Sequence, residues 1–282
     1  MDLPLFQLDA FTEGPFTGNP AAVVLLPGGD PWPSDELAQA IALENNLSET
    51  AFLHPFLPSD ITPPPVEGPA YHLRWWTPAI EVDLCGHATL ASAGLLFDDV
   101  HPEASTLAFW TRSGWLVARR AGDDAVTLDF PAAQLQEATV PQALLDAVGV
   151  DPVAIYRATD VVLVLRDESA VRDADPDQSA LRAFDVRGVV VTAPGTGDVD
   201  VVSRFFGAGA GVGEDPVTGS AHSQFARYCC QRLGRTSFLA RQLSERGGTV
   251  AVVLDGDRAL LTGRYRRYLQ GLVTVPDTLA AD

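Results

Sequence analysis

The sequence predicts an α/β protein built from two similar halves, and three observations lead to this prediction. Residues 85–89 and 214–222 each place a glycine and small polar residues where a loop should become a helix. Aligned on Gly86 and Gly219, these two segments are 219 − 86 = 133 residues apart, close to half of the 282-residue chain. The order of a strand, a helix and further strands also recurs in both halves.

The two segments are expected to place two helix N-termini at a shared cleft. Glu81 and Glu214 fall at the same offset before their glycines, and His87 aligns with Ser220. The first N–H groups of a helix have no acceptor within the helix, and its dipole is positive at this end. Both segments are therefore candidate binding sites for an anion such as a carboxylate.

In the first half, apolar alternation and turn residues predict the strands, and caps predict the helices. Ser34 is a plausible N-cap followed by two acids. The proline-rich stretch 54–69 must be a loop. The small residues of 85–97 imply a helix that is surrounded by other elements. The expected elements are strands at 5–9 and 21–26, a helix after Ser34, a strand at 47–53, a strand at 71–77, the helix 85–97, and strands within 107–120 and 125–130.

In the second half, the same signals predict more strands and a second central helix. Gly-Gly and Asp-Gly pairs mark turns between the last strands. The final stretch, 265–275, is apolar enough to pack and is expected to cross back to the first half. The expected elements are a helix at 141–148, strands at 154–157 and 161–166, a short helix at 178–184, strands at 186–193 and 199–206, the helix 220–233, and strands at 242–246, 249–254 and 259–264.

These elements suggest one half at residues 1–120, joined by 265–282, and another at 121–264. The 46% hydrophobic content is enough for a full core. No run of 18 apolar residues and no signal peptide is found, so no contact with a membrane is expected. The three cysteines have no metal-binding spacing, so no metal is expected and a reducing cytoplasm is the simplest location.

Charge and the absence of lysine exclude several functions. The net charge of −18 makes nucleic-acid binding improbable because phosphates would be repelled. The 19 basic residues are all arginine. A Schiff-base lysine and a P-loop lysine are therefore both absent, which excludes pyridoxal-phosphate enzymes and P-loop nucleotidases. Arginine suits bidentate recognition of carboxylates.

Glu49 is a charged residue inside an otherwise apolar strand. Alternation places it on the same face as Leu47, Ala51 and Leu53. A carboxyl on a buried face has a raised pKa and can act as a general base or acid. An exposed glutamate at a strand edge is the alternative that the pattern leaves open.

His87 and Asp215 lie at the two expected helix starts. A helix N-terminus disfavours imidazolium, so a neutral His87 ring is expected. Asp215 followed by Pro216 also matches ordinary helix capping. Glu214 and the small residues after Pro216 would nevertheless place two acids and a hydroxyl at one helix start. The glycines of 207–213 are a weak match to a dinucleotide loop, because the two acids would repel phosphate.

Cys85 could act as a thiol base at a helix N-terminus, where its pKa would fall. Thr218 occupies the matching position in the second half, so a racemase with two thiols is not available. Cys229 and Cys230 lie inside the second central helix and are expected to pack in the core.

Taken together, the motifs resemble the PhzF (phenazine biosynthesis-like) proteins, which are relatives of diaminopimelate epimerase. The match extends over nearly the whole chain, in the expected order. It is carried by residues 9–11 (DAF), 18–23 (GNPAAV), 47–52 (LSETAF), 85–89 (CGHAT) and 211–222 (GVGEDPVTGSAH).

The resemblance implies two α/β halves, each with a curved, mixed and mostly antiparallel sheet around a central helix, and an active site between them. It also implies a homodimer without a cofactor. The characterised activity of the family is the isomerisation of trans-2,3-dihydro-3-hydroxyanthranilate. By motif, the catalytic residues would be Glu49, His87 and Asp215. The substrate carboxylate and its neighbours would be bound by Asn19, Gly86, Gly219 and Ser220.

The sequence departs from the family pattern at Gly207-Ala208, where members often have Ala-Pro. Compared with the epimerases, only the first thiol, Cys85, is retained. Proton relocation by one carboxyl therefore fits better than inversion by two cysteines. An amino-acid racemase that uses Cys85, and a non-enzymatic binding protein on the same fold, are the alternatives.

Overall fold

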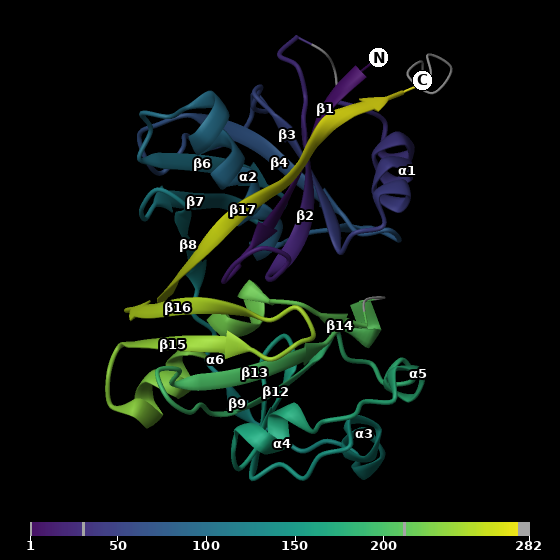
Figure 1. Ribbon diagram of the computed structural model, residues 1–282, viewed down its shortest axis with the longest axis vertical. Coiled ribbons are helices and arrows are strands. Elements are labelled where there is room, and N and C mark those ends of the chain that lie inside the picture. Colours follow the sequence, from purple (N-terminus) through teal and green to yellow (C-terminus); the bar gives the residue numbers. More distant parts are fainter. Residues whose placement is uncertain (1, 30–31, 211–212, 276–282) are drawn as a thin grey trace. The chain divides into compact units, whose positions relative to one another are not determined.

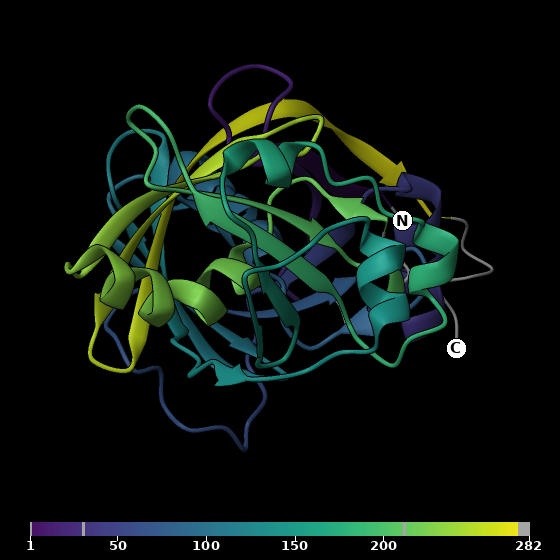
Figure 2. The ribbon, with the colours of Figure 1, turned by 90° about the horizontal axis from the view of Figure 1, so that it is seen from below.

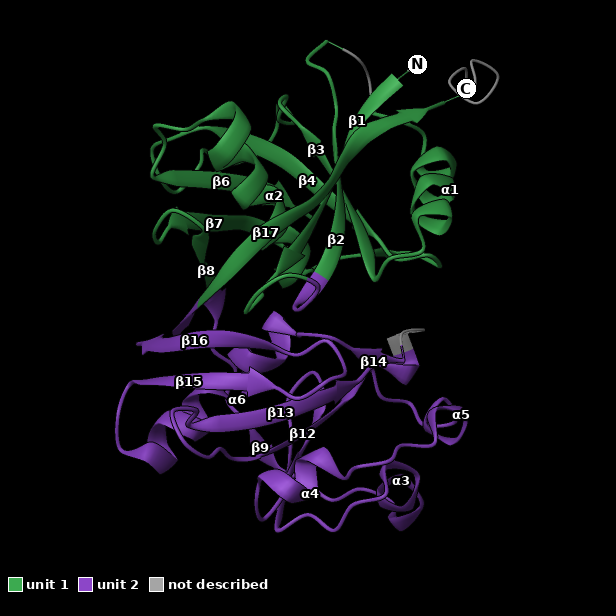
Figure 3. Ribbon diagram, viewed as in Figure 1, with its two compact units in different colours: residues 1–15, 20–129, 262–282 green, residues 16–19, 130–261 purple. Residues whose placement is uncertain are grey.

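The computed structural model describes residues 2–29, 32–210 and 213–275, which form a mixed α+β fold dominated by strands (Figure 1). The chain divides into two compact units (Figure 3). Unit 1 comprises residues 1–15, 20–129 and 262–282, and unit 2 comprises residues 16–19 and 130–261. The division into halves expected from the sequence, with its boundary at residue 120, stays a prediction of domain organisation.

Unit 1 is built on a closed ring of eight strands, ordered β1–β2–β3–β4–β6–β7–β8–β17 and back to β1. β2 pairs with β3 and β4 pairs with β6 in parallel, so the sheet is mixed. Its elements are β1 (Asp2–Ala10), β2 (Asn19–Leu25), α1 (Asp35–Asn45), β3 (Glu49–His54), β4 (Ala70–Trp76), β5 (Glu81–Val82), α2 (Gly86–Leu95), the π-helix η1 (Leu96–Val100), β6 (Thr106–Thr111), β7 (Gly114–Arg120), β8 (Ala125–Pro131) and β17 (Arg258–Thr274).

Helix α2 is the buried centre of unit 1, and all ten of its residues are buried. It packs against β1, β3 and β7. This confirms that a helix rich in Gly, Ala and Ser is surrounded by other elements, since small side chains allow strands to approach on every side. The proline-rich stretch before β4 has no helix or strand and forms a long blue loop in Figure 2.

Gly94 shows how tightly α2 is enclosed. A Cβ atom added at Gly94 would lie 2.6 Å from ring carbons of Tyr265 in β17. The Tyr265 ring cannot easily move away, because its hydroxyl donates a hydrogen bond to Asp98 Oδ1 at 2.8 Å. Only glycine fits this contact between helix and strand.

Gly94→Ala is therefore expected to destabilise the protein by about 1–3 kcal/mol, the usual cost of overpacking a core. Urea unfolding of both proteins measures this difference. Gly14→Ala is the matched control, because a Cβ there meets nothing within 4 Å. Equal stability of Gly94→Ala and the wild type would show that β17 does not pack this closely on α2.

Unit 2 has a mixed sheet ordered β9–β10–β11–β12–β13–β15–β16, in which β11–β12 and β13–β15 are the parallel pairs. Helix α6 packs against β15 and β16 (Figures 1 and 2). Its elements are β9 (Gln136–Glu137), α3 (Gln142–Val148), β10 (Ala154–Arg157), β11 (Val161–Val164), α4 (Glu168–Arg172), α5 (Gln178–Leu181), β12 (Val189–Pro194), β13 (Val201–Phe206), the 3₁₀ turn η2 (Ala208–Ala210), β14 (Glu214–Asp215), α6 (Gly219–Leu233), β15 (Ser237–Gln242) and β16 (Gly248–Asp255).

Both faces of the valine-rich strands in unit 2 are covered. Val161 and Leu163 belong to the core formed with α3, α4 and α5. Val164, on the alternate face, lies beside Tyr228 of α6. This explains why β11 and β12 are apolar without interruption, as expected of strands buried on two sides. In the described part of the chain, no helix is long and apolar enough to span a membrane.

Several expected elements differ in the structure. The strand predicted at 242–246 is wrong: β15 ends at Gln242, and Gly247, with a φ of +64°, lies in the turn that follows. The stretch after residue 264 is not a separate segment but the continuation of β17, which pairs with β1. Helix α4, capped by the Asp167 side chain, was not predicted. Gly211 and Val212 of the last motif lie outside the described residues.

Candidate active site

Glu49 is the first residue of β3 and pairs in register with Ala21 of the parallel strand β2. Its side chain is 15% exposed, so the carboxylate is largely withdrawn from water. The residues after it, Thr50 to His54, are all buried, so both faces of β3 are covered. Glu49 shares one face of β3 with Ala51 and Leu53, which are both buried, as the sequence predicted.

His87 is the second residue of α2, and its side chain is only 5% exposed. Its Nε2 atom lies 3.2 Å from Glu49 Oε2, and its Nδ1 atom lies 3.6 Å from Cys85 Sγ. Burial lowers the pKa of His87 from 6.5 to about 3. The ring is therefore neutral near pH 7, as expected from the sequence, with loss of hydration as the cause.

The start of α2 is formed by Cys85, the N-cap in extended conformation, and by Gly86. The Cys85 carbonyl accepts hydrogen bonds from the Thr89 hydroxyl and the Thr89 N–H. Glu81 lies outside this site: Arg74 donates two hydrogen bonds to its carboxylate, at 2.7 and 2.8 Å. The acid five residues before Gly86 therefore has a structural role, because it binds an arginine of the neighbouring strand and not the helix start.

In unit 2, Asp215 is the last residue of β14 and is 8% exposed. Asn19 Nδ2 donates to its Oδ1 at 2.8 Å, and the Thr218 hydroxyl donates to its Oδ2. Burial raises the pKa of Asp215 from 3.8 to about 6, against the lowering effect of these two hydrogen bonds. Asp215 can therefore gain or lose a proton close to neutral pH.

Asp215 does not cap a helix, which corrects that interpretation of the Asp-Pro pair. Thr218 is the N-cap of α6, and the helix begins at Gly219. Gln242, at the end of β15, supports this turn: its Oε1 accepts from the Thr218 N–H, and its Nε2 donates to the Asp215 carbonyl. Sequence reasoning missed Gln242, because nothing local distinguishes it from any other polar residue near a strand end.

Arg187 lies close to the start of α6 and is held in place by hydrogen bonds, and the sequence did not predict it as a site residue. Arg187 donates two hydrogen bonds to the fully buried Asp160, and its Nη2 lies 3.5 Å from Ser220 Oγ. Gln224 Nε2 donates to the same carboxylate at 2.6 Å. Asp160 stands directly before the apolar run of β11, and this acid was the signal in the sequence that could have pointed to a buried ion pair.

Glu214 does not act at the helix start beside Asp215. Its carboxylate accepts hydrogen bonds from Arg204 at 2.7 and 2.9 Å, as Glu81 does from Arg74 in unit 1. The structure thus brings Glu49, Cys85 and His87 together in unit 1. It brings Asn19 and Asp215 together in unit 2, beside Gly219 and Ser220 at the start of α6.

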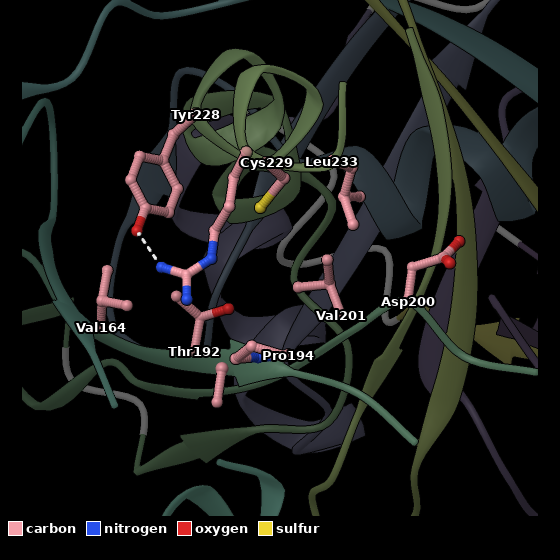
Figure 4. A pocket seen from close by; sticks show the side chains of 10 residues that line it. Val164, Thr192, Pro194, Asp200, Val201, Tyr228, Cys229 and Leu233 are labelled. Carbon is pink, nitrogen blue, oxygen red and sulfur yellow. Dashed lines mark hydrogen bonds between the residues drawn. The ribbon is translucent and has the colours of Figure 1, made fainter. Parts of the chain in front are cut away.

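Figure 4 shows a pocket in unit 2, between α6 and the strands β11 to β13. Its volume is about 40 Å³, far below the several hundred Å³ of a typical ligand site. At the edge of this pocket, Arg232 donates a hydrogen bond of 3.1 Å to the Tyr228 hydroxyl. Burial raises the pKa of the Cys229 thiol to about 12, so this cysteine is an inert core residue, as expected.

Comparisons with known proteins agree on one family. The sequence profile of the PhzC-PhzF family, described as phenazine biosynthesis-like protein, matches residues 8–271. An uncharacterized isomerase of Pseudomonas aeruginosa is 44% identical over 271 residues, which are 96% of this chain and 98% of the relative. A PhzF-family crystal structure from Enterococcus faecalis matches with a TM-score of 0.86 and 39% identity, covering 98% of this chain and all of that one.

The fold is also similar to that of more distant enzymes. A hydroxyproline epimerase from Agrobacterium vitis matches with a TM-score of 0.61 at 16% identity, covering 99% of this chain and 94% of that one. At this identity the likeness concerns the fold alone.

Proposed function

Because the chain belongs to the phenazine biosynthesis-like (PhzF) family, we propose that it is an isomerase that moves a proton without a cofactor. The substrate is a small cyclic or amino-acid-like carboxylate of the dihydro-hydroxyanthranilate type. Similar proteins named isomerases, such as the Pseudomonas aeruginosa relative, support this reaction class.

The observation that carries the proposal is the contact between Glu49 and His87. The Glu49 carboxyl is largely withdrawn from water, so it can exchange a proton with a bound substrate rather than with bulk solvent. Glu49 takes a proton from an activated carbon and returns it to another carbon on the same face of the substrate. The neutral His87 ring lies 3.2 Å away and holds the Glu49 carboxyl in place. A ring N–H can donate to the carboxylate, and a ring nitrogen without hydrogen can accept from the carboxylic acid.

Asp215 binds the amine or hydroxyl of the substrate. Its pKa of about 6 allows it to accept a hydrogen bond as an anion or to donate one as an acid. The N–H groups of Gly86 and Gly219 and the Ser220 hydroxyl donate to the substrate carboxylate, since helix N-termini favour anions. Asn19 orients Asp215 through the 2.8 Å hydrogen bond and adds an amide to the same site.

The two halves are proposed to be copies of one ancestral unit, each with a curved sheet around a central helix. The two parallel pairs in each sheet support this, as do the matching Arg74–Glu81 and Arg204–Glu214 pairs. The protein is further expected to be a homodimer in the cytoplasm. Sedimentation velocity distinguishes a dimer from the 30.0 kDa monomer.

Proton NMR in D₂O tests the proposed reaction. Trans-2,3-dihydro-3-hydroxyanthranilate is the first substrate, followed by cyclic and amino-acid carboxylates. The expected result is a new set of product signals with deuterium at the proton-accepting carbon. If no compound of this class is converted or exchanged, the proposal is wrong and a binding protein on the same fold is the better interpretation.

Cys85→Ala separates this reaction from a racemase that uses Cys85 as a base. The proximity of Cys85 Sγ to His87 Nδ1, 3.6 Å, is the observation that favours the racemase. Under our proposal, Cys85→Ala retains kcat within about 10-fold, because Glu49 alone carries the proton. Chiral chromatography and NMR measure both reactions, with Cys229→Ala as the matched control. Loss of turnover in Cys85→Ala alone would favour the racemase.

A further inference from the structure

Three side chains in unit 1 gather donor atoms of the kinds that bind a thiophilic divalent cation. Glu49, Cys85 and His87 each offer one ligand atom, and these atoms all lie within 4.8 Å of one another. Glu49 comes from the start of β3, and the other two come from the start of α2. The carboxylate therefore meets a thiol and an imidazole that are 36 and 38 residues further along the chain.

The three ligand atoms lie within 4.8 Å of one another, so small side-chain rotations bring them to the distances found around a single metal ion. Zinc binds nitrogen and oxygen at about 2.0–2.2 Å and sulfur at about 2.3 Å, which places the donors of a tetrahedral ion roughly 3.3–3.6 Å apart. His87 Nε2 and Glu49 Oε2 are 3.2 Å apart, and Cys85 Sγ and His87 Nδ1 are 3.6 Å apart. These contacts use different ring nitrogens, so binding through one nitrogen requires a rotation of the Glu49 or the Cys85 side chain.

Burial and charge both favour a dication. Cys85 and His87 are each about 95% buried, so an ion here would be largely shielded from water. A thiolate and a carboxylate carry two negative charges, which balance one divalent cation and avoid a net buried charge. Sulfur and imidazole ligands select zinc-class ions, whereas Mg²⁺ and Ca²⁺ prefer oxygen donors alone.

We propose that Glu49, Cys85 and His87 bind one zinc-class divalent cation, and that the bound ion blocks proton transfer by Glu49. The ion takes the same carboxylate that the isomerase uses as its base, so metal binding and proton transfer exclude each other. Three protein ligands leave a fourth position for water or an anion. The binding step itself is independent of the identity of the substrate.

Titration of the metal-stripped, full-length protein with Co²⁺ tests the site. Cobalt bound to a thiolate gives a sulfur-to-metal charge-transfer band in the near ultraviolet. We expect one ion per chain, displacement by Zn²⁺ and no displacement by Mg²⁺. Cys85→Ser is expected to abolish the band. Glu49→Gln and His87→Gln keep the thiol and are expected to weaken binding by about 10- to 100-fold or more.

Cys229→Ser combined with Cys230→Ser is the matched control, because both thiols are buried in α6 and should not contribute. Melting curves without metal establish that each variant is folded, and Glu49→Gln replaces Cys85→Ser if the latter is not. No band in the wild type, a band that persists in Cys85→Ser, or binding unchanged in Glu49→Gln would each overturn the metal site.

The outcomes for the metal site and for the isomerase can be told apart. Cobalt binding is measured without substrate, and turnover is measured in the presence of EDTA. Turnover in a protein that binds no cobalt would refute only the metal site. Cobalt binding without turnover of any carboxylate would leave the metal site intact and refute the isomerase, together with the block of proton transfer that rests on it.

Discussion

Glu49→Gln is expected to lower kcat by about 10²- to 10⁴-fold, the usual contribution of a general acid or base. Glutamine has nearly the shape of glutamate but cannot accept and return a proton. The substitution keeps a polar group 3.2 Å from His87, so the fold and the KM are expected to change little. Proton NMR of the reaction in D₂O measures kcat and deuterium incorporation together.

Glu44→Gln is the control for this substitution, because it makes the same chemical change at an exposed position of α1. It should retain the kcat of the wild type. Melting curves of both variants distinguish loss of catalysis from loss of folding. Full turnover by a folded Glu49→Gln protein would remove Glu49 from the role of base.

Asp215→Asn is expected to remove a pH-dependent loss of stability. The pKa of Asp215 is raised from 3.8 to about 6 in the folded state because the carboxyl is buried. A raised pKa means that the folded state binds the proton more tightly than the unfolded state. The contribution of the protonated acid is therefore complete below pH 3.8 and is lost as the pH rises through 6.

The size of this effect follows from the rise of the Asp215 pKa from 3.8 to about 6. At about 1.4 kcal/mol per unit, the buried charge costs on the order of 3 kcal/mol above pH 7. Asp215→Asn removes that cost and can still accept from Asn19, while the Thr218 hydroxyl turns to accept from the new amide. The variant should therefore gain stability relative to the wild type as the pH rises.

Urea unfolding from pH 5 to pH 8 measures the difference between the two proteins, which should grow by roughly 1–1.5 kcal/mol over this range. The buried His87 and His222 also titrate abnormally, with pKa values lowered to about 3 and about 4. They are present in both proteins, so their contribution cancels. A difference that does not vary with pH would show that the pKa of Asp215 is not raised.

The local signals of this sequence were sufficient for several elements. Ser34 caps α1 through its side chain, which accepts a hydrogen bond from the Leu37 N–H, as the pattern predicted. The small residues of α2 predicted a surrounded helix because small side chains leave room for strands on all sides. In each case the information lies within a few residues of the element itself.

Signals that depend on long-range pairing were misinterpreted. The sequence placed Gln242 at the start of a strand, whereas it ends β15 and binds the backbone around Asp215, 27 residues away. It treated Glu214 as part of a reactive cluster, but Arg204 holds that carboxylate. Neither partner could be identified locally, since a side-chain contact depends on strand order and register.

The sequence by itself determined the residue types at the two helix starts, and hence the family. Only the tertiary structure decided which of these residues meet. His87 reaches Glu49 across 38 residues because α2 lies inside the strand ring, and Asn19 reaches Asp215 across 196 residues. Burial at these contacts then sets the protonation of His87 and Asp215, because desolvation depends on the packing of distant segments and not on neighbours in the chain.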